Sequence, residues 1–477
     1  MSKINQKFSN VREWLGIPYA KAARFQKPEL VPFDKSLPYD EKGPAPLQAG
    51  DTSWLEADNG FSEDCLNLNV WAPEDRGDEL LPVVIYIHGG GWVLGSNGQT
   101  TSNAAGLAAT GRVIGVSINY RLGPFGFLSL AQYGGKLKDA TNLGLQDMVT
   151  ALKWVKENIQ EFGGDPNNVT LTGHSAGAFS IFSLLGVPEA DGLFHHIAAF
   201  SGMPARLVPA WVSEERALKV LKHFGCEDDP EKLLEVDAYE LAEAMSATQA
   251  ADPGVQHGVD NNVIAMTDDR HLPNGVIAEH AMTVLESGKH KDVDILFSST
   301  SQETYWWVLH KTKEFDPGSV QGLVEEFAHS NRITLTRARQ IMEVFNADDL
   351  KPVEIRGNLL TNFSFTLPQT RGALAHASAG GKAYLMAVGP VEGADYAVHG
   401  TEMYGIVGQT SPSASEEQMA RDVQVRDAVL ALAEGKELPW PTVTKDRLYV
   451  NGIGNLPYDA TEHAKLVLET FDGIQRP

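Results

Sequence analysis

Short apolar runs rich in β-branched residues recur along the chain and predict buried strands. They lie at 83–87, 113–118, 169–172, 197–200, 293–299 and 383–388. Between them, apolar residues at helical spacing predict helices, most clearly over 142–162, where a Gly-Gly-Asp-Pro stop follows. This alternation predicts an α/β fold with a mostly parallel central sheet and helices on both faces.

Two stretches depart from this pattern. Residues from about 205 to 290 and from 305 to 360 are rich in short charged helical segments, such as 212–222, and lack strong strand runs. We expect them to form helical cap insertions over an edge of the sheet. No internal repeat or linker-like segment interrupts the chain, so a single domain over 1–477 is predicted.

Composition and charge narrow the classes of partner. The 477 residues are 43% hydrophobic, which suffices for a large core, and 62 acidic against 39 basic residues give a net charge of −23. Such a field repels phosphate backbones and anionic headgroups, so no nucleic-acid or membrane partner is expected. Neither a spanning apolar run nor an apolar signal region is present, and Cys65 and Cys226 are expected to be free thiols. These features predict a cytoplasmic protein, with its oligomeric state left open.

The first chemical signal follows the strand at 169–172. That strand runs directly into Gly173-His174-Ser175-Ala176-Gly177, and a helical segment at 178–185 comes next. A serine hydroxyl becomes a useful nucleophile when a sharp turn exposes it beside a base, and flanking glycines allow the strand and the helix to approach closely. The pattern predicts a nucleophile elbow at Ser175, with a glycine-rich connecting loop as the simpler reading.

A second signal follows the strand at 83–87. Three consecutive glycines, Gly89 to Gly91, come after His88 and before Trp92. Their backbone N–H groups can face a developing oxyanion without intervening side chains. Considered alone the triplet fits a flexible turn, but together with the elbow it predicts an oxyanion hole.

The acid and the base of a triad are expected after Ser175 in the chain, in that order. Glu303 lies just after the strand at 293–299, although a lone carboxylate there also fits an ordinary surface position. Of the five histidines beyond it, only His399 occupies a glycine-flanked loop after a predicted strand, and a solvated loop histidine is the alternative. The other four are His310, His329, His376 and His463.

Ordered motifs along nearly the whole chain resemble the type B carboxylesterase family, which includes the cholinesterases. They are Gly16-Ile17-Pro18-Tyr19-Ala20, Glu63-Asp64-Cys65-Leu66-Asn67-Leu68-Asn69-Val70, the glycine triplet, Asn119-Tyr120-Arg121 with Gly123 and Gly126-Phe127, the elbow, Phe162-Gly163-Gly164-Asp165-Pro166, Ser201-Gly202, Gln302-Glu303 and His399-Gly400-Thr401-Glu402. The resemblance implies one α/β-hydrolase domain. It places the family's nucleophile, acid and base on Ser175, Glu303 and His399, and its oxyanion donors on Gly90, Gly91 and Ala176.

Some positions depart from the family or carry a weaker expectation. The family usually has Glu before the nucleophile, where this chain has His174; we expect a buried, hydrogen-bonded histidine there, with the base role as an unfavoured alternative. Neither Cys65 nor Cys226 has the cysteine with which the family forms a disulfide. Four tryptophans are assigned to substrate binding, with core packing as the alternative: Trp54, Trp92, Trp306 and Trp307.

The resemblance implies hydrolysis of small carboxylic esters through an acyl-enzyme on Ser175, and the four tryptophans predict that aromatic or bulky groups are accepted. Neither an organic cofactor nor a metal is expected, because spacings such as His-Glu-x-x-His are absent. An amidase or a carbamate hydrolase with the same triad is the alternative enzyme. A non-catalytic binding module is a second alternative, although it would be expected to lack a triad residue and to carry a signal segment and disulfides.

Overall fold

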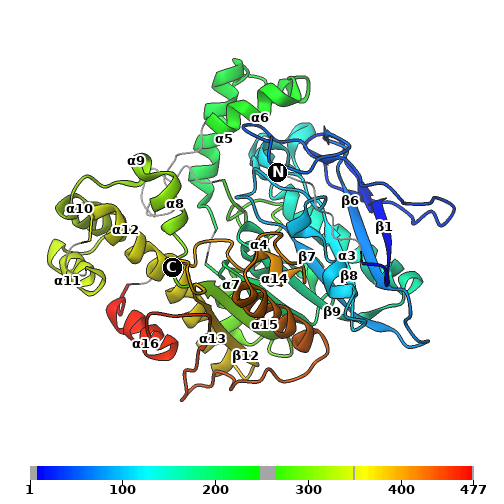
Figure 1. Ribbon diagram of the computed structural model, residues 1–477. Helices are drawn as coiled ribbons and strands as arrows, with labels where there is room; N and C mark the ends of the chain where they lie inside the picture. Colours follow the sequence, from blue (N-terminus) through cyan, green and yellow to red (C-terminus); the bar gives the residue numbers. More distant parts are fainter. Residues whose placement is uncertain (1–7, 206, 248–263, 347–349, 475–477) are drawn as a thin grey trace.

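A twisted sheet forms the centre of the molecule (Figure 1). The computed structural model describes residues 8–205, 207–247, 264–346 and 350–474. Nine described strands follow the order β1-β6-β8-β7-β9-β10-β11-β12-β13. Their bounds are β1 Val11–Pro18, β6 Asn67–Pro73, β7 Leu81–Ile87, β8 Ile114–Ile118, β9 Gly164–His174, β10 His196–Phe200, β11 Asp294–Thr300, β12 Ala383–Val388 and β13 Asn451–Ile453. The β1–β6 and β6–β8 pairs are antiparallel and the other pairs of this sheet are parallel, so the carboxyl ends of β7, β9, β10, β11 and β12 meet at one edge.

All six predicted strands are confirmed, with bounds that shift by a few residues. Strands β1, β6 and β13 were not predicted. In β6 the apolar alternation is interrupted by Asn67 and Asn69, which are nevertheless buried because their amides bond to neighbouring backbone carbonyls. Strand β1 lies at the edge of the sheet and is largely exposed or half-buried, so it lacks a clean apolar pattern.

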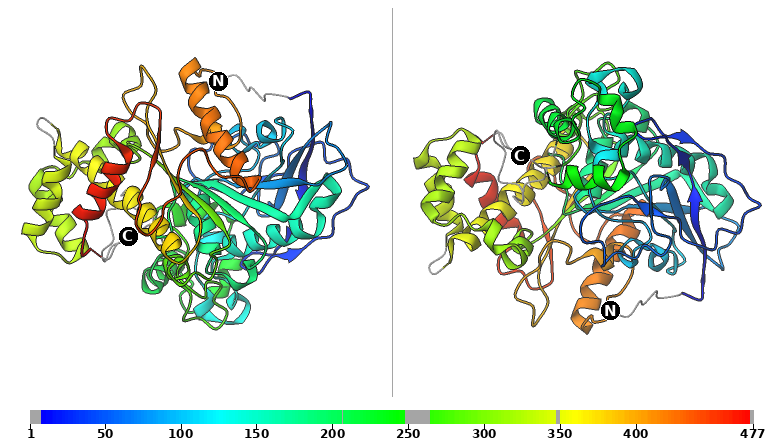
Figure 2. Two further views of the ribbon diagram at one scale, coloured as in Figure 1. Left: turned by 90° about the horizontal axis from the view of Figure 1, so that it is seen from below. Right: turned by 90° about the horizontal axis from the view of Figure 1, so that it is seen from above.

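Alternate residues of the central strands pack into two separate cores, one on each face of the sheet. In β7, Val83 and Ile85 join the larger core, while Val84 and Tyr86 join the other. Helices α3 (Leu143–Asn158), α4 (Ala176–Leu184) and α13 (Leu367–Ser378) cover the first face, and α15 (Glu416–Ala433) covers the second (Figure 2). The helix predicted over 142–162 is confirmed as α3 with a 3₁₀ turn at its end.

The two segments without predicted strands are helical. The first contains α5 (Ala210–Phe224), α6 (Ala238–Ala247) and α7 (Ala281–Ser287); the second contains α8 (Tyr305–His310), α9 (Thr312–Phe315), α10 (Val320–Asn331), α11 (Leu335–Phe345) and α12 (Pro352–Thr361). Helices α10 to α12 share a small core of their own with α16 (Ala460–Thr470). Figure 1 shows both groups beside the sheet, and their role as a cap stays a prediction.

Three further expectations concern the described residues. Cys65 and Cys226 are both buried free thiols, as predicted. None of the helices described here combines the length and the apolar character that a membrane crossing requires. Within the same residues, no group of three or more histidine, cysteine, aspartate or glutamate side chains could hold a metal ion.

Candidate active site

Ser175 occupies a strained turn between β9 and α4. Its φ of 54° is positive, which a non-glycine residue adopts only at a cost of about 1–3 kcal/mol, and the turn is held by a 2.9 Å bond from its N–H to the Phe200 carbonyl. A Cβ at Gly177 would lie 2.1 Å from the Ile87 carbonyl oxygen, and one at Gly173 would lie 2.8 Å from it. The flanking glycines therefore permit the close strand–helix approach that the sequence predicted.

Three side chains from distant parts of the chain form one line of hydrogen bonds. His399, in the loop after β12, has Nε2 2.8 Å from Ser175 Oγ and Nδ1 2.6 Å from Glu303 Oε2. Glu303 follows β11 and is 0% exposed; its other oxygen, Oε1, accepts from the Thr300 N–H at 2.8 Å. The His399 N–H also donates to the Glu303 carbonyl, which fixes the two loops against each other. The geometry fits a base oriented by a buried carboxylate.

The glycine segment after β7 lies beside Ser175. Gly90 and Gly91 both have positive φ, 106° and 62°, and a Cβ at Gly90 would lie 1.9 Å from the Leu94 carbonyl oxygen. The amides of Gly90, Gly91 and Ala176 have no hydrogen-bond acceptor within the described part of the chain, and all three residues line the same cavity as Ser175. They are thus free to donate to an oxygen bound there.

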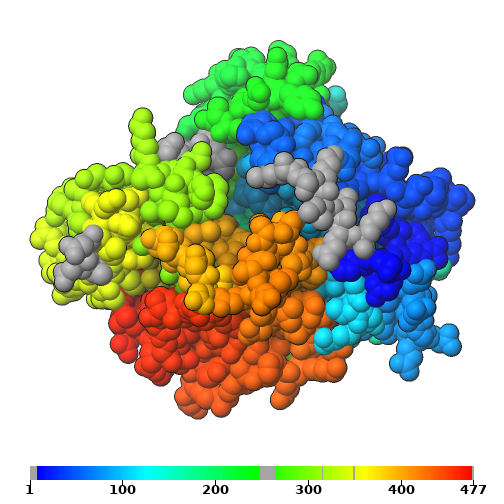
Figure 3. Space-filling view, viewed as in Figure 1, coloured from blue at the N-terminus to red at the C-terminus, as the bar shows by residue number. Residues whose placement is uncertain are grey.

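This cavity has a volume of about 690 Å³ and lies over the carboxyl ends of the central strands. Its wall comes from three parts of the chain, namely 54–102, 174–179 and 264–403. On the face shown in Figure 3, segments coloured blue, light green and orange surround a recess, which matches these sources. Such a volume accommodates a drug-sized molecule.

Four tryptophans were predicted to bind substrate, and the structure places them differently. Trp54 and Trp306 line the cavity with 55% and 37% of their surfaces exposed, and the Trp307 ring lies 5.5 Å from that of His399. Trp92 also borders the cavity, but its indole is 2% exposed and donates to Ser180 Oγ at 3.0 Å. Most of its ring is packed in the core, and its assignment to substrate binding stays a prediction.

Comparison with known proteins decides the family. Residues 2–433 match the sequence profile of the carboxylesterase family. The chain belongs to this family. It is 36% identical over 306 residues to para-nitrobenzyl esterase of Bacillus subtilis (strain 168), an alignment that covers 62% of this chain and 60% of that protein. It is also 40% identical over 226 residues to phenmedipham hydrolase of Pseudarthrobacter oxydans, across 45% of this chain and 44% of that protein.

Solved structures of carboxylesterases match more of this chain than the sequence alignments do. A carboxylesterase of Geobacillus stearothermophilus superposes with a TM-score of 0.80 at 28% identity, covering 96% of this chain and 97% of that chain. The predicted α/β-hydrolase fold and the family resemblance are therefore confirmed. The sequence alignments with the two curated relatives span less than two thirds of either one.

His174 directly precedes Ser175 at the end of β9. The residue is buried, its ring centroid lies 4.6 Å from that of His399, and its Nε2 has no hydrogen-bond partner among the described residues. The burial that we expected is confirmed, while the expected hydrogen bond of the ring stays a prediction. Burial, together with the nearby His399, lowers the pKa of His174 well below its ordinary value, so the ring stays neutral. The hydroxyl of Ser175 bonds to His399 and not to His174.

Two residues behind Glu303 were quoted as family motifs but received no role from the sequence. Ser201 Oγ lies 2.7 Å from Glu303 Oε1 and 2.7 Å from Glu402 Oε1. One hydroxyl hydrogen serves only one of these carboxylates, so the second contact needs a proton on Glu402. Glu402 is 0% exposed, and burial and the charge of Glu303 raise its pKa to about 7. A neutral Glu402 can donate to Ser201, which in turn donates to Glu303.

This raised pKa predicts a pH-dependent stability. In the unfolded chain Glu402 titrates near 4.5, so between pH 4.5 and 7 the folded protein holds a proton that the unfolded chain has released. The unfolding free energy of the wild type should therefore fall by about 2 to 4 kcal/mol, relative to Glu402→Gln, as the pH rises through this window. Urea unfolding of both proteins at pH 5 and 7.5 measures the difference. A difference that does not change with pH would contradict this assignment.

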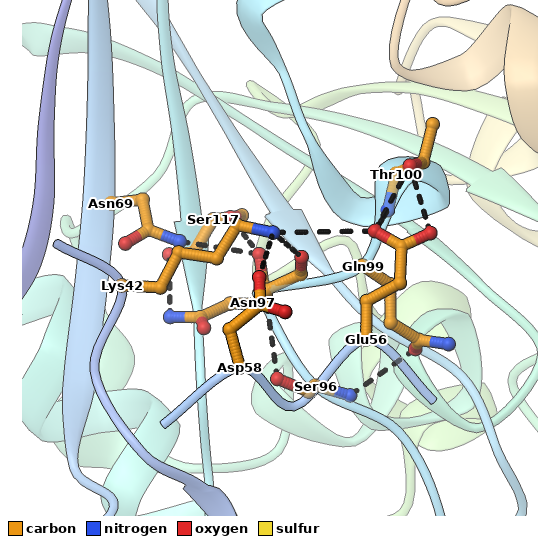
Figure 4. Close-up of polar contacts among 10 residues, drawn as sticks. Lys42, Glu56, Asp58, Asn69, Ser96, Asn97, Gln99, Thr100 and Ser117 are labelled. Atoms are coloured by element: carbon orange, nitrogen blue, oxygen red, sulfur yellow. Dashed lines mark hydrogen bonds and ion pairs between the residues drawn. The ribbon is translucent and has the colours of Figure 1, made fainter. Parts of the chain in front are cut away.

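A polar cluster fixes the loop that carries Trp54 (Figure 4). Lys42 Nζ donates to the Gly98 carbonyl at 2.6 Å and lies 3.6 Å from Asp58 and 4.0 Å from Glu56. Glu56 accepts from the N–H and the Oγ1 of Thr100 at 3.1 and 2.9 Å. These contacts join residues 56–58 to 98–100, and both segments lie next to cavity-lining residues. The cluster thus sets the position of one wall.

Removing this connection should affect substrate binding more than chemistry. Glu56→Ala deletes charge-assisted bonds of about 1.5–3 kcal/mol each in a half-exposed setting, so we expect KM for a bulky aryl ester to rise about three- to tenfold while kcat changes less than twofold. Steady-state kinetics of Glu56→Ala beside the neighbouring surface change Glu41→Ala test this. Equal effects of the two variants would mean that the cluster does not position the wall.

Other cavity residues escaped the sequence analysis. Phe179 and Phe365 line the cavity, and the Phe365 ring lies 5.7 Å from that of His399. Lys311 and Met403 also line the cavity. Phe179 lies one turn after Ser175 on α4, a signal that was available; Phe365 lies in a π-helical turn at 362–366, whose approach to the site is a tertiary contact.

Proposed function

We propose that this chain hydrolyses carboxylic esters through a covalent acyl-enzyme on Ser175. The observation that carries the proposal is the position of His399. Its Nε2 lies 2.8 Å from the Ser175 hydroxyl, and its Nδ1 lies 2.6 Å from the Glu303 carboxylate. Membership of the carboxylesterase family supports the same activity.

In the first half of the proposed reaction, His399 Nε2 takes the proton of Ser175 as Oγ attacks the ester carbonyl. Glu303 accepts a hydrogen bond from Nδ1, which holds the imidazole in the required tautomer and stabilises the imidazolium that forms. The amides of Gly90, Gly91 and Ala176 donate to the developing oxyanion, and one such donor is typically worth about 3 kcal/mol. His399 then protonates the leaving alcohol.

In the second half, water attacks the acyl carbonyl and gives its proton to His399. Ser175 leaves as the carbonyl re-forms and recovers its proton from His399, which releases the carboxylic acid. Throughout, Ser201 and a neutral Glu402 support the side of Glu303 that faces away from His399. The proton thus moves between Ser175, His399 and the reactants alone.

The proposed substrates are small neutral or aromatic esters. The wall of the cavity contains Trp54, Trp306, Trp307, Phe179 and Phe365, which favour apolar and aromatic groups. The names of the two curated relatives state para-nitrobenzyl and phenmedipham as their substrates. An amidase or a carbamate hydrolase with the same three side chains remains the second candidate, since the relative named for phenmedipham is 40% identical.

A matched substrate set tests the choice of reaction. We expect kcat/KM for 4-nitrophenyl butyrate to exceed that for the corresponding 4-nitroanilide by at least tenfold, with an N-aryl carbamate of the same leaving group between them. A higher value for the anilide or for the carbamate would assign the chain to that class instead.

We also infer a cytoplasmic location, supported by two buried thiols without disulfides.

A further inference from the structure

The charges that line the cavity differ from those of the protein as a whole. The chain carries 62 acidic residues and a net charge of −23, yet no aspartate or glutamate is among the described residues that line the cavity. Glu303 and Glu402 lie behind the wall and are 0% exposed. The described wall therefore offers no carboxylate to a cationic ligand.

One formally charged side chain does line the cavity. Lys311 is exposed, follows the end of α8, and forms no ion pair with any residue that the structure describes. Its N–H donates to the Trp307 carbonyl at 2.8 Å, so it lies one helical turn beyond Trp307. An unpaired ammonium group at this point can bind an anionic group of a ligand.

Two histidines of the wall, His88 and His174, add no positive charge beside Lys311. Burial lowers the pKa of His88 to about 4, and that of His174 well below its ordinary value, so both stay neutral near pH 7. With both rings neutral, Lys311 is the dominant fixed charge of the described lining.

We propose that this cavity selects esters that carry a carboxylate remote from the reacting carbonyl, and that Lys311 is the residue that binds it. The inference rests on the proposed ester hydrolysis. The Trp307 ring lies 5.5 Å from the His399 ring, and Lys311 lies a further turn away, about 6 Å along the helix. A lysine side chain on that turn suits a charge on the far side of an aryl ring from the ester.

Three aryl acetates that differ only in the para substituent test this inference. They are 4-acetoxybenzoate, which is anionic, methyl 4-acetoxybenzoate, which is neutral, and (4-acetoxyphenyl)trimethylammonium, which is cationic. Each kcat/KM is divided by the rate constant of alkaline hydrolysis of the same ester, so that leaving-group differences cancel. The neutral ester then serves as the reference within each protein, and Lys311→Met and Lys313→Met shift the net charge of −23 by the same single unit.

The variants are Lys311→Met, Lys311→Glu and the matched control Lys313→Met, an exposed lysine that does not line the cavity. Because Lys311 is solvated, we expect Lys311→Met to lower the anionic-to-neutral ratio about three- to fivefold and Lys311→Glu about tenfold. Lys311→Glu should also raise the cationic-to-neutral ratio about tenfold, while Lys313→Met changes either ratio less than twofold. His174→Glu should raise the cationic ratio through the wall itself, whatever its effect on absolute rates.

Two results would overturn the inference. One is an equal shift for Lys313→Met and Lys311→Met, which would trace the selectivity to the overall field; the other is a ratio that does not respond to Lys311→Glu. Both leave hydrolysis of the neutral ester intact. If the proposed function itself were wrong, the wild type would not hydrolyse methyl 4-acetoxybenzoate at all.

Discussion

Replacing Ser175 by alanine is expected to lower kcat for an aryl ester by about a millionfold, the loss typical of a triad nucleophile. The Oγ atom lies 2.8 Å from His399 Nε2 and sits on a turn whose positive φ of 54° presents it to the cavity. Alanine keeps the Cβ and the turn but removes the atom that forms the acyl-enzyme. Only binding and the oxyanion donors would then remain to accelerate the reaction.

A second serine on the same helix provides the control. Ser183 lies on α4 two turns after Ser175, and its hydroxyl bonds to the Phe179 carbonyl away from the cavity. Ser183→Ala should therefore keep kcat within about twofold of the wild type, because a surface or helix hydroxyl of this kind contributes little to chemistry. Steady-state kinetics and the pre-steady-state burst of 4-nitrophenol measure both variants. Ester turnover by Ser175→Ala within tenfold of the wild type would remove Ser175 from its proposed role.

Glu303→Gln is expected to lower kcat by about a thousand- to ten-thousandfold, as loss of the orienting carboxylate does in other triads. The glutamine amide can donate to His399 Nδ1, which then becomes an acceptor. In that tautomer Nε2 carries the hydrogen and cannot take the proton of Ser175. The Glu303 side chain does not line the cavity, so KM should change less than about threefold.

A variant of Glu402, the neighbouring buried carboxylate, distinguishes a loss of His399 orientation from a loss of packing around Glu303. Glu402→Gln changes the other side of Ser201 and imitates the protonated form that we assign to Glu402, so kcat should fall less than about tenfold. Far-ultraviolet circular dichroism of both variants checks that the fold is retained. If Glu303→Gln kept near-normal kcat, or lost no more than Glu402→Gln, another residue would orient His399.

Much of this site could be predicted from the sequence because its signals are local. The elbow needs glycines at fixed offsets, since a Cβ at Gly177 would overlap the Ile87 carbonyl, and such a requirement is written in five consecutive residues. The strands that end at Ile87 and Val388 are nearly continuous apolar runs, because both of their faces are buried.

Sequence patterns say less where residues distant along the chain set the environment of a side chain. Trp92 follows the glycine triplet, yet its indole turns into the core toward Ser180, 88 residues later. Strand β6 contains two asparagines that are nevertheless buried, since asparagine side chains from several segments satisfy one another. The partnerless nitrogen of His174 likewise depends on what packs around it and not on the elbow pattern.

The sequence by itself determined the alternation of strands and helices, the turn at Ser175 and the loop positions of Glu303 and His399, because backbone sterics and burial periodicity act over a few residues. The tertiary structure alone decided that Ser201 and Glu402 stand behind Glu303, that Lys311 joins the cavity wall, and which tryptophans face it. Those relations join side chains about 100 to 200 positions apart, and only the packing of the sheet against its helices sets their distances and their local dielectric.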